Sequence, residues 1–502
     1  MGELSTPPTP ALPCAAAGFV DGAWVCGDAD VEQVLDPATG AVLGAVPHAT
    51  PAQVASAVAA ARRAADGAWG RETPAGRSAL LRRLLDTLAA EADRILEVVV
   101  AETGCPVTLA RGQQVGLPLQ HLAYWADAAL RPELDPRPPV VTTRSDGSGV
   151  VGNWVVRREP YGVVAAITPY NFPFLENVMK LGPALAAGNA VVLKPSPYTP
   201  FSGLLLAEAW QRADLPPGVL NVVTGGAEVG VPLTCDPGVD LISFTGADAV
   251  GAAILAAAAP RLTKVLLELG GKSALIVRAD ADLELAARLG AAGVTTHAGQ
   301  GCVLTTRHLV YPSVRTEYLD RMATLLSKAV VGDPRDPVTT MGPLIRTVAR
   351  DRVEDYVAGA LAQGARVVHG AARPDNLPAH LGGAYYLPTV LAEVDNTWPV
   401  AREEIFGPVA VVIEVADDDE AIEVANDSPY GLGGHIVGRD TAAAFAMANR
   451  LRVGSVDLNG GPGWTNPAVP FGGMKRSGLG RENGPEGLDE YTQLKTIKFP
   501  AR

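Results

Sequence analysis

Three side chains in this 502-residue chain have surroundings suited to covalent chemistry at a carbonyl group. Cys302 ends a Gly-Gln-Gly-Cys sequence, whose small residues leave space for a carbonyl carbon to approach the sulfur. Glu268 closes an apolar run, where partial desolvation should raise the pKa of its carboxyl toward that of a general base. Asn171 directly follows another apolar run, and its amide could donate a hydrogen bond to a developing oxyanion.

Each of these three residues also has an ordinary structural explanation. Taken alone, Cys302 fits a half-buried structural cysteine, and Glu268 fits a carboxylate that faces solvent at a strand end. Asn171 fits a common turn residue. No single motif therefore decides the chemistry.

Composition excludes several other functions. The seven histidines are scattered and there is no CxxC pair, so no metal site is predicted. The chain lacks the GxSxG elbow of serine hydrolases and the phosphate loop of P-loop enzymes. A net charge of −13 without a Lys/Arg cluster argues against nucleic acid or anionic membrane as a partner.

Cysteine use and the N-terminus indicate a reducing compartment. The five cysteines are far apart, which is not typical of a disulfide framework. The first residues lack a basic segment followed by an apolar one, and no apolar run reaches the roughly 18 residues of a membrane span. A cytoplasmic location is therefore expected.

From Gly162 onward, short apolar runs alternate with helical patterns. This alternation is typical of parallel sheets covered by helices on both faces, and it predicts two α/β units in series. Helices are expected around 174–187, 200–213 and 248–258 and from Leu283. Strands are expected at 163–168, 190–194, 220–223, 241–244, 264–267, 274–277 and 307–311.

The first third of the chain has a different character. The stretch to about Phe19 is rich in Pro, Ala and Thr and is expected to be a loose arm. Thr50 and Pro51 predict a helix start. A second helix is expected through Leu80 and Leu88, ending near Gly104. The Pro-rich segment 131–149 is interpreted as an excursion from the main body.

Together, seven segments in order resemble the aldehyde dehydrogenase superfamily, over roughly residues 20–500. The resemblance is specific because the order and spacing of all seven agree, whereas any one of them would be weak. The segments are Thr-Pro-Tyr-Asn-Phe-Pro (168–173), Leu-Lys-Pro-Ser (193–196), Phe-Thr-Gly (244–246), Leu-Glu-Leu-Gly-Gly-Lys-Ser (267–273), Gly-Gln-Gly-Cys (299–302), Glu-Glu-Ile-Phe-Gly-Pro (403–408) and Pro-Phe-Gly-Gly (470–473).

The resemblance implies a role for each residue of the catalytic set. Cys302 would be the nucleophile that forms a thioester, Glu268 the base that activates water, and Asn171 an oxyanion donor together with the Cys302 backbone N–H. Lys180 matches a lysine linked to the proton relay, and a solvated helix charge is the alternative. The implied reaction is oxidation of an aldehyde to a carboxylic acid with NAD(P).

The resemblance also implies a set of cofactor contacts. Lys194 would lie near the adenosine ribose, Glu404 near the nicotinamide ribose, and Phe406 beside the nicotinamide. Glycines 246 and 251 would let the backbone approach a phosphate closely. The full implied set is Thr168, Pro169, Lys194, Ser196, Gly246, Gly251, Leu269, Glu404 and Phe406.

Three departures from the family pattern bear on these contacts. Pro197 replaces a common ribose-binding Glu, and Ala247 replaces a common Ser that could bind phosphate. Pro485 stands where some members carry another carboxylate of the proton relay. The first two make the sequence less decisive between NAD and NADP. We expect NAD, with NADP as the alternative.

The positions that line the substrate tunnel in the family are occupied in this chain by small, flexible or charged residues. They are Glu176, Met179, Gly301, Val303 and Thr465. Glu176 either meets a polar or cationic aldehyde or is a solvated carboxylate at the tunnel mouth. The aldehyde itself is not identified.

The resemblance further implies a division into three parts. Residues 19–137 and 160–268 would form the dinucleotide-binding domain, and 269–472 the catalytic domain. Residues 138–159 and 484–499 would form a strand-based oligomerisation element, giving a homodimer or homotetramer. Two alternatives keep the fold: a coenzyme-A-acylating dehydrogenase, which Glu268 disfavours, and a catalytically silent structural member.

Overall fold

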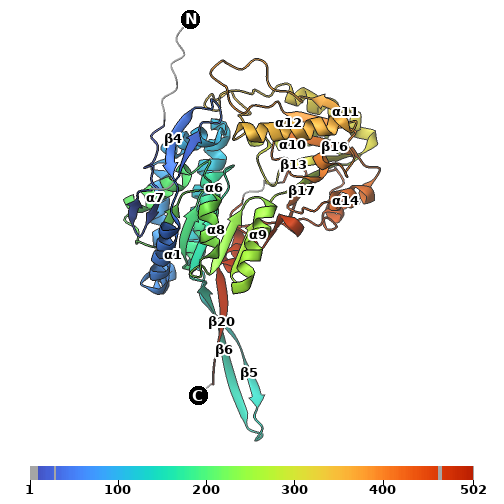
Figure 1. Ribbon diagram of the computed structural model, residues 1–502. Coiled ribbons are helices and arrows are strands. Elements are labelled where there is room, and N and C mark those ends of the chain that lie inside the picture. Colours follow the sequence, from blue (N-terminus) through green and yellow to red (C-terminus); the bar gives the residue numbers. More distant parts are fainter. Residues whose placement is uncertain (1–9, 28–29, 462–465, 501–502) are drawn as a thin grey trace.

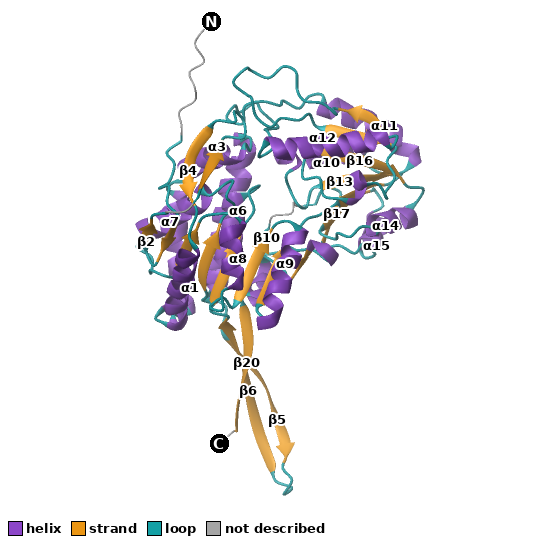
Figure 2. Cartoon of the chain, viewed as in Figure 1, coloured by secondary structure: helices purple, strands orange, loops and turns teal. Residues whose placement is uncertain are grey.

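The computed structural model describes residues 10–27, 30–461 and 466–500. These residues form two α/β bodies and a narrow three-stranded arm that projects away from them (Figure 1). Helices surround the sheet of each body, whereas the arm consists of strands alone (Figure 2). The predicted fold class, two doubly wound parallel-sheet units plus a small strand-based element, is confirmed.

The first body is built on an eight-stranded sheet within the described residues, in the order β19-β11-β10-β7-β8-β9-β1-β2. Its five central strands are parallel, and β1, β2 and β19 run antiparallel at the edges. The strands are β1 (Gly18–Val20), β2 (Ala23–Val25), β7 (Val163–Ile167), β8 (Ala190–Lys194), β9 (Leu220–Val223), β10 (Leu241–Thr245), β11 (Lys264–Glu268) and β19 (Gly478–Leu479).

Most of the helices of this body lie in the first half of the chain. They are α1 (Pro51–Asp66), α2 (Pro74–Ala89), α3 (Ala92–Thr103), α4 (Val107–Ala110), the π-helical turn η2 (Arg111–Gly116), α5 (Leu117–Ala128), α6 (Pro173–Ala187), α7 (Phe201–Arg212), α8 (Ala227–Cys235), α9 (Asp248–Ala258) and α16 (Gly484–Glu490). Short 3-10 turns η1 (Trp69–Arg71) and η3 (Ala259–Arg261) and the hairpin β3 (Val31–Leu35) and β4 (Val42–Pro47) complete it.

Strand order creates a crevice at one edge of this sheet. The chain runs from β7 to β8 and β9 on one side, and then β10 pairs with β7 on the other side. Ligands bind at such a reversal, outside the carboxyl ends of the strands, because the connections diverge there. The segments that begin at Thr168 and Gly246 therefore flank the crevice.

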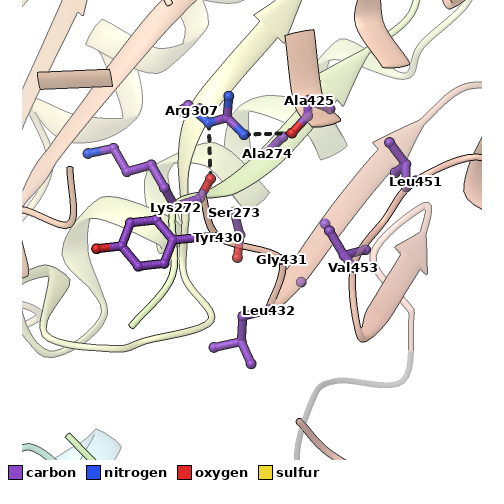
Figure 3. Close-up of a pocket in the computed structure, with 12 residues that line it drawn as sticks. Lys272, Ser273, Ala274, Arg307, Ala425, Tyr430, Gly431, Leu432, Leu451 and Val453 are labelled. Carbon is purple, nitrogen blue, oxygen red and sulfur yellow. Dashed lines mark hydrogen bonds between the residues drawn. The ribbon is translucent and has the colours of Figure 1, made fainter. Parts of the chain in front are cut away.

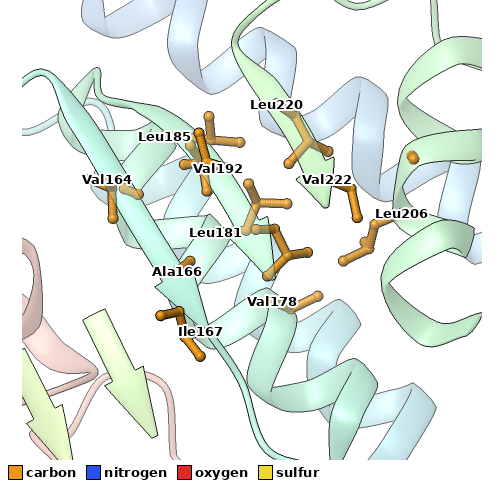
Figure 4. Close-up of a cluster of buried hydrophobic side chains, with 14 of the residues drawn as sticks. Val164, Ala166, Ile167, Val178, Leu181, Leu185, Val192, Leu206, Leu220 and Val222 are labelled. Carbon is orange, nitrogen blue, oxygen red and sulfur yellow. The ribbon is translucent and has the colours of Figure 1, made fainter. Parts of the chain in front are cut away.

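Helix α6 is the most deeply buried helix that carries site residues. Pro173 occupies its first turn, and Gly188 ends it in the left-handed conformation at φ 96°. Its side chains Val178, Leu181 and Leu185 pack among apolar residues of β7, β8 and β9 (Figure 4). Because apolar groups surround the helix, any polar side chain on it must find a partner inside the protein.

The second body is built on a seven-stranded sheet, parallel except for β14, in the order β14-β15-β16-β13-β12-β17-β18 over the described residues. The strands are β12 (Ser273–Val277), β13 (Thr305–Val310), β14 (Arg366–His369), β15 (Thr389–Ala392), β16 (Val409–Glu414), β17 (Gly433–Val437) and β18 (Ser455–Leu458). The helices are α10 (Leu283–Thr295), α11 (Pro312–Leu326), α12 (Thr347–Ala362), α13 (Pro399–Arg402), α14 (Asp418–Asn426) and α15 (Thr441–Ala448), with 3-10 turns η4 (Thr296–Gly299) and η5 (Lys475–Ser477).

Alternation along β12 shows how this sheet forms two cores. Ala274 and Ile276 belong to one buried cluster, whereas Leu275 and Val277 belong to the cluster on the opposite face. Successive side chains of a strand point to opposite faces, so a continuous apolar run is what a strand covered on both sides requires.

The arm consists of β5 (Leu134–Thr143), β6 (Gly149–Pro160) and β20 (Thr492–Pro500), with β6 in the centre. All pairings in it are antiparallel, and Thr492 pairs with Pro160 where the arm leaves the first body. The expected excursion at 131–149 is thus one strand, the turn and the start of the next strand.

One expected helix is two helices. The segment through Leu80 and Leu88 ends at Ala89, and a separate helix begins at Ala92 and ends before Gly104. Glu91 adopts non-helical angles of φ −114° and ψ 15°, which breaks the backbone hydrogen bonding between the two. Leucine spacing alone did not reveal this break. Among the described residues, no helix combines the length and apolarity needed to cross a bilayer.

The contact between α5 and α6 gives a testable prediction. A Cβ on Gly182 would lie 2.3 Å from Cδ1 of the buried Trp125, so Gly182→Ala should destabilise the protein by about 1–3 kcal/mol. Gly359 in α12 has nothing within 4 Å of its missing Cβ, so Gly359→Ala should stabilise by about 0.4–1 kcal/mol. Unfolding midpoints of the two variants check this, and a Gly182→Ala protein as stable as wild type would contradict the packing.

Candidate active site

One cavity collects residues from four distant parts of the chain. Cys302 and Asn171 both line it, together with α5 and the segments on either side of β19. Its lining residues are His121, Asn171, Phe172, Glu176, Met179, Gly301, Cys302, Val303, Phe471 and Asn483. The structure therefore brings the expected nucleophile and oxyanion donor together. Thr465, expected at the tunnel, lies outside the described residues.

Cys302 is held in place by an unusual backbone. After α10, His297, Ala298 and Gly299 follow one another in the left-handed conformation, with φ of 47°, 53° and 74°. A Cβ on Gly299 would lie 2.1 Å from the carbonyl oxygen of Gly407, so only glycine fits. Such strain persists only where the surroundings enforce it, which points to a demand on the position of the cysteine.

The side chain of Gln300 fixes the same loop from the other side. Its Nε2 donates to the carbonyl of His297 at 3.0 Å, and its Oε1 accepts from the backbone N–H of Ile345 at 2.9 Å. Gln300 is fully buried, so these bonds are shielded from water. Sequence reasoning noted Gln300 only as part of a motif and missed this anchoring role.

The sulfur of Cys302 lies among negative groups. Burial raises the pKa of its thiol well above the ordinary value, and the carboxylates of Glu176, Glu404 and Glu268 raise it further. The thiol is therefore protonated in the free protein at neutral pH. A nucleophilic sulfur needs a nearby proton acceptor or an added positive charge.

Asn171 is oriented by its neighbours. The side-chain Nδ2 of Asn171 donates one hydrogen bond to the backbone carbonyl of Gln300 at 3.0 Å. The backbone carbonyl of Asn171 accepts a hydrogen bond from Gln114 Nε2 at 2.9 Å. An amide NH₂ has two donor hydrogens, so the second remains for an oxygen inside the cavity. This geometry suits stabilisation of an oxyanion.

Glu268 ends β11 where the chain crosses from the first sheet to the second. A Cβ on Gly472 would lie 2.5 Å from Glu268 Oε1, so this glycine, at φ 147°, is what makes room for the carboxylate. Neither oxygen has a hydrogen-bond partner among the described residues. Burial raises the pKa of this carboxyl well above its ordinary value, and Glu482 adds to the effect. The direction agrees with the sequence-based expectation.

Lys180 is buried and not a solvated helix charge. Its Nζ lies 2.8 Å from Glu482 Oε1 and 3.2 Å from Ser243 Oγ, and the two charged side chains are 0% and 1% exposed. Tyr491 donates to the same Ser243 hydroxyl at 3.0 Å. A chain of hydrogen-bonding groups thus leads away from the carboxylates.

Sequence reasoning missed Glu482. Pro485 had been interpreted as the site of a lost relay carboxylate, but Pro485 is exposed at the start of α16, and the carboxylate that binds Lys180 is Glu482. The signal available was an acidic residue shortly after the Pro-Phe-Gly-Gly motif, at the end of a Gly-rich segment. A single carboxylate in such a segment gives no indication of burial.

A groove between the two bodies reaches Glu404, whose carboxylate is close enough to Cys302 to raise the pKa of its thiol. It runs from Ala247 at the start of α9 to Glu404, and the side chains of Arg352, Arg402 and Arg476 line it. Ala247 offers no side-chain cap to α9, and the first-turn N–H of Ala249 donates to Asp248 Oδ1 at 2.8 Å. The arginines suit the phosphates of a dinucleotide, and Glu404 supplies a carboxylate for a ribose hydroxyl.

The residues expected near the nicotinamide surround the inner end of the groove. Glu404 Oε1 accepts from the backbone N–H of Gly271 at 2.9 Å, and burial raises the pKa of Glu404 to about 7. Phe406 adopts φ 55°, and its ring meets that of Tyr170 edge to face at 5.9 Å. Tyr170 was not among the expected cofactor residues.

The loop that carries Gly271 is tied to the second body by Arg307. Its guanidinium donates to the carbonyl of Lys272 at 3.0 Å and to that of Ala425 at 2.9 Å (Figure 3). The side chain of Lys272 is buried without a partner for its Nζ among the described residues, and burial lowers its pKa to about 7. The loop is therefore positioned by the hydrogen bond from Arg307 to its backbone carbonyl, and not by the side chain of Lys272.

The residues expected near the adenosine lie at the carboxyl end of β8. Lys194 Nζ donates to the carbonyls of Pro195 and Gly225, at 3.1 and 2.7 Å, which leaves one N–H. Burial lowers the pKa of Lys194 to about 8. Ser196 Oγ accepts from the backbone N–H of Tyr198 at 3.2 Å.

Other expected contacts have structural roles as well. Thr168 donates to Asn177 of α6 at 2.6 Å, and Pro169 is half-buried beside it. A Cβ on Gly251 would lie 2.7 Å from Cδ2 of Leu269, so in this structure Gly251 makes room for Leu269. The Cβ position of Gly246 faces the ring of Phe244 at 2.5 Å. Close approach of these two glycines to a phosphate stays a prediction.

The buried Lys180–Glu482 pair gives a second prediction. Lys180→Met would leave Glu482 without its counter-charge, so it should destabilise the protein by about 3–5 kcal/mol. The double variant Lys180→Met/Glu482→Leu should recover most of this loss because no charge of the pair stays unpaired. Unfolding midpoints of the single and double variants provide the measurement; a harmless single substitution would contradict the pairing.

Comparison with known proteins agrees with this geometry. The model of the aldehyde dehydrogenase family matches residues 24–497. The chain is 39% identical to a 3-succinoylsemialdehyde-pyridine dehydrogenase from a Pseudomonas species, over 95% of this chain and 97% of that protein. It is also 39% identical to geranial dehydrogenase of Castellaniella defragrans, over 95% and 98%.

Solved structures show the same likeness. A crystal structure of Mycobacterium tuberculosis aldehyde dehydrogenase with NAD+ superposes with a TM-score of 0.88 at 40% identity, covering 95% of this chain and 97% of that one. Because the family model spans nearly the whole chain and relatives above 30% identity cover both chains almost fully, this protein belongs to the aldehyde dehydrogenase family.

Proposed function

We propose that this protein oxidises an aldehyde to the carboxylic acid through a thioester on Cys302, with NAD as the electron acceptor. The observation that supports this most is the shared cavity of Cys302 and Asn171. Glu404, whose charge acts on the Cys302 thiol, also lines a groove with Arg352 and Arg476. The NAD+ complex of the M. tuberculosis relative supports the choice of cofactor. When bound, NAD(P)+ accepts the hydride that the aldehyde carbon loses.

Addition of the sulfur is the first chemical step. The Cys302 thiol transfers its proton to a carboxylate, and the sulfur forms a bond to the carbonyl carbon. The carbonyl oxygen becomes an alkoxide, held by the free N–H of Asn171 Nδ2 and the backbone N–H of Cys302. A single donor of this kind contributes about 2.7–4 kcal/mol in other enzymes.

A thioester remains once the carbon of this alkoxide has lost its hydride to the acceptor named above. Hydrolysis of the thioester follows. Glu268 takes a proton from water, the hydroxide adds to the acyl carbon, and the carbon–sulfur bond breaks to release the acid. The carboxyl of Glu268, whose pKa is raised, holds that proton. Lys180, Ser243 and Tyr491 provide hydrogen-bonding groups through which a proton can leave.

The coenzyme-A-acylating alternative is disfavoured by Glu268, since a thiol acceptor does not need a water-activating base. The names of the two relatives differ in the aldehyde they specify, one a semialdehyde and the other geranial. The substrate is therefore not transferred from a relative. A cytoplasmic location fits the five cysteines, all of which are free.

NAD is favoured over NADP by a negative charge near the proposed adenosine site. Glu228 lies close enough to Lys194 for the two charges to interact. The carboxylate of Glu228 acts to raise the pKa of Lys194, and the ammonium of Lys194 acts to lower the pKa of Glu228. A 2′-phosphate on the ribose would meet this carboxylate, whereas a hydroxyl would not be repelled.

We also propose that the arm pairs subunits in a homodimer or homotetramer. Strands β5 and β20 are the edges of the three-stranded sheet, so their outer backbone groups are unpaired. Exposed apolar side chains on these edges include Val141 at 71% and Leu494 at 69%. Such an edge favours pairing with another chain.

Glu268→Gln tests the two-step mechanism. The variant should release one burst of NADH per active site, because the thioester still forms, and steady-state turnover should then fall by about 10²–10⁴-fold. Because the pKa of Glu268 is raised, the wild-type deacylation rate should rise with pH as this carboxyl loses its proton, and the variant should lose that rise. Cys302→Ala should show neither burst nor turnover while keeping its unfolding midpoint.

Three results would contradict this assignment. Loss of burst and turnover together in Glu268→Gln would make the residue structural. Strict dependence of NADH formation on added coenzyme A would favour the acylating reaction. Full turnover in Cys302→Ala would exclude covalent catalysis.

Glu228→Gln tests the cofactor preference. Wild type should bind NAD+ more tightly than NADP+, and the variant should narrow this ratio by about fivefold, since the charge is partly exposed. Equilibrium binding of both nucleotides without aldehyde is the measurement. An unchanged ratio would remove Glu228 from the explanation.

Leu494→Glu tests the arm. Light scattering should give a wild-type mass that is a multiple of 52.0 kDa, and the variant should shift toward the monomer because a buried charge opposes strand pairing. Val348→Glu is the matched control, since Val348 is 76% exposed on α12, away from the arm. A monomeric wild type, or equal behaviour of both variants, would contradict the proposal.

A further inference from the structure

Two polar side chains in the Cys302 cavity have no part in the reaction described above. Glu176 lies in the first turn of α6, and His121 lies on the adjacent helix α5. Both line the cavity. Glu176 Oε2 and both ring nitrogens of His121 are buried and have no hydrogen-bond partner among the described residues. Buried polar atoms normally have partners, so these atoms indicate a place for a polar group of a ligand.

The rest of the cavity offers Glu176 and His121 no charged partner, and its other amide side chains are Asn171 and Asn483. Four of its lining residues are apolar or aromatic: Phe172, Met179, Val303 and Phe471. Among the described lining residues there is no lysine or arginine. Lys180, one turn beyond Glu176, is bound to Glu482 and Ser243, and its side chain is 0% exposed.

The charge of this part of the cavity is negative or zero near neutral pH. Burial and the nearby Glu482 raise the pKa of Glu176 to about 7, so the carboxyl is partly ionised there. Burial lowers the pKa of His121 to about 4, so the imidazole is neutral and offers one donor and one acceptor. None of the described residues that line the cavity carries a positive charge that could receive an anion.

We propose that Glu176 and His121 form a polar subsite that selects aldehydes bearing a hydrogen-bond donor, above all a protonated amine, and that disfavours aldehydes bearing a carboxylate. This inference rests on the proposed function, because the subsite acts on a substrate only if an aldehyde enters beside Cys302. A charge-assisted bond from an ammonium to Glu176 is stronger than a neutral one. A carboxylate would meet a like charge with no cation to balance it.

An ammonium at this position would also assist the sulfur. The carboxylate of Glu176 is the first of the charges that raise the pKa of the Cys302 thiol. A bound cation offsets that charge, so the thiol loses its proton more easily with a cationic substrate than with a neutral one. A cationic aldehyde should therefore show a higher kcat as well as a lower KM than a neutral one.

Four aldehydes test the subsite in the NAD-loaded enzyme. 3-Aminopropanal, 3-hydroxypropanal and butanal have the same number of heavy atoms and differ only in the terminal ammonium, hydroxyl or methyl group. Succinate semialdehyde adds the carboxylate. In wild type, kcat/KM should follow the order ammonium, hydroxyl, methyl, carboxylate, with about tenfold or more between ammonium and methyl.

Variants assign the preference to residues. Glu176→Gln should reduce the ratio of 3-aminopropanal to butanal about tenfold and raise succinate semialdehyde relative to butanal. His121→Phe should reduce the ratio of 3-hydroxypropanal to butanal. Glu97→Gln, which removes an exposed carboxylate of α3 outside the cavity, should leave all ratios unchanged. Ratios are compared because Glu176→Gln also changes the pKa of the Cys302 thiol in the free enzyme, and that change is common to all four aldehydes.

A binding measurement separates the subsite from the chemistry. Propylammonium should inhibit wild type competitively against butanal and more strongly than butyrate does, and Glu176→Gln should abolish that difference. Equal inhibition by the two ions in wild type, or an unchanged 3-aminopropanal ratio in a folded Glu176→Gln protein, would overturn the subsite. Failure to oxidise any of the four aldehydes would instead overturn the proposed function.

Discussion

One buried ammonium group holds the catalytic region together. Lys180 lies in a cluster with the carboxyls of Glu176, Glu268 and Glu482, and its ion pair with Glu482 is almost fully shielded from water. Three negative charges around a single positive one cannot all exist in a medium of low dielectric constant, so some of the carboxyls keep their protons. Burial raises the pKa of Glu268 and Glu176, and the negative charge of Glu482 raises both further.

Burial, and then the neighbouring carboxylates, keep the thiol of Cys302 neutral in the free protein. The same carboxyls that can accept or carry protons during turnover also oppose formation of a thiolate. The thiol therefore stays protonated until a positive charge lowers its pKa. That charge comes from the pyridinium of the cofactor or, in the proposed subsite, from the substrate. Glu404 lines the groove between the bodies and its charge acts on the Cys302 thiol, so a cation bound at that end of the groove would act on the thiol as well.

Much of the fold could be predicted from the sequence, because parallel strands buried on both faces need continuous apolar runs. The strands at 190–194 and 220–223 occur where they were expected. The break between α2 and α3 was missed, since leucines at helical spacing continue on both sides of Glu91. For the site, Cys302, Glu268 and Asn171 could be named from their motifs, whereas Glu482 and His121 could not, because nothing local marks their burial.

The sequence by itself determined the chemical identity of the groups, the order of the strands along the chain and the positions of the glycines at which the backbone turns. Side-chain type and hydrophobic periodicity are local properties, and local properties are written in the sequence. The tertiary structure alone decided which charges meet, since Lys180 and Glu482 are 302 residues apart and attract each other only because the fold buries both. Desolvation depends on what surrounds a group from every side, and only the packed structure determines that surrounding.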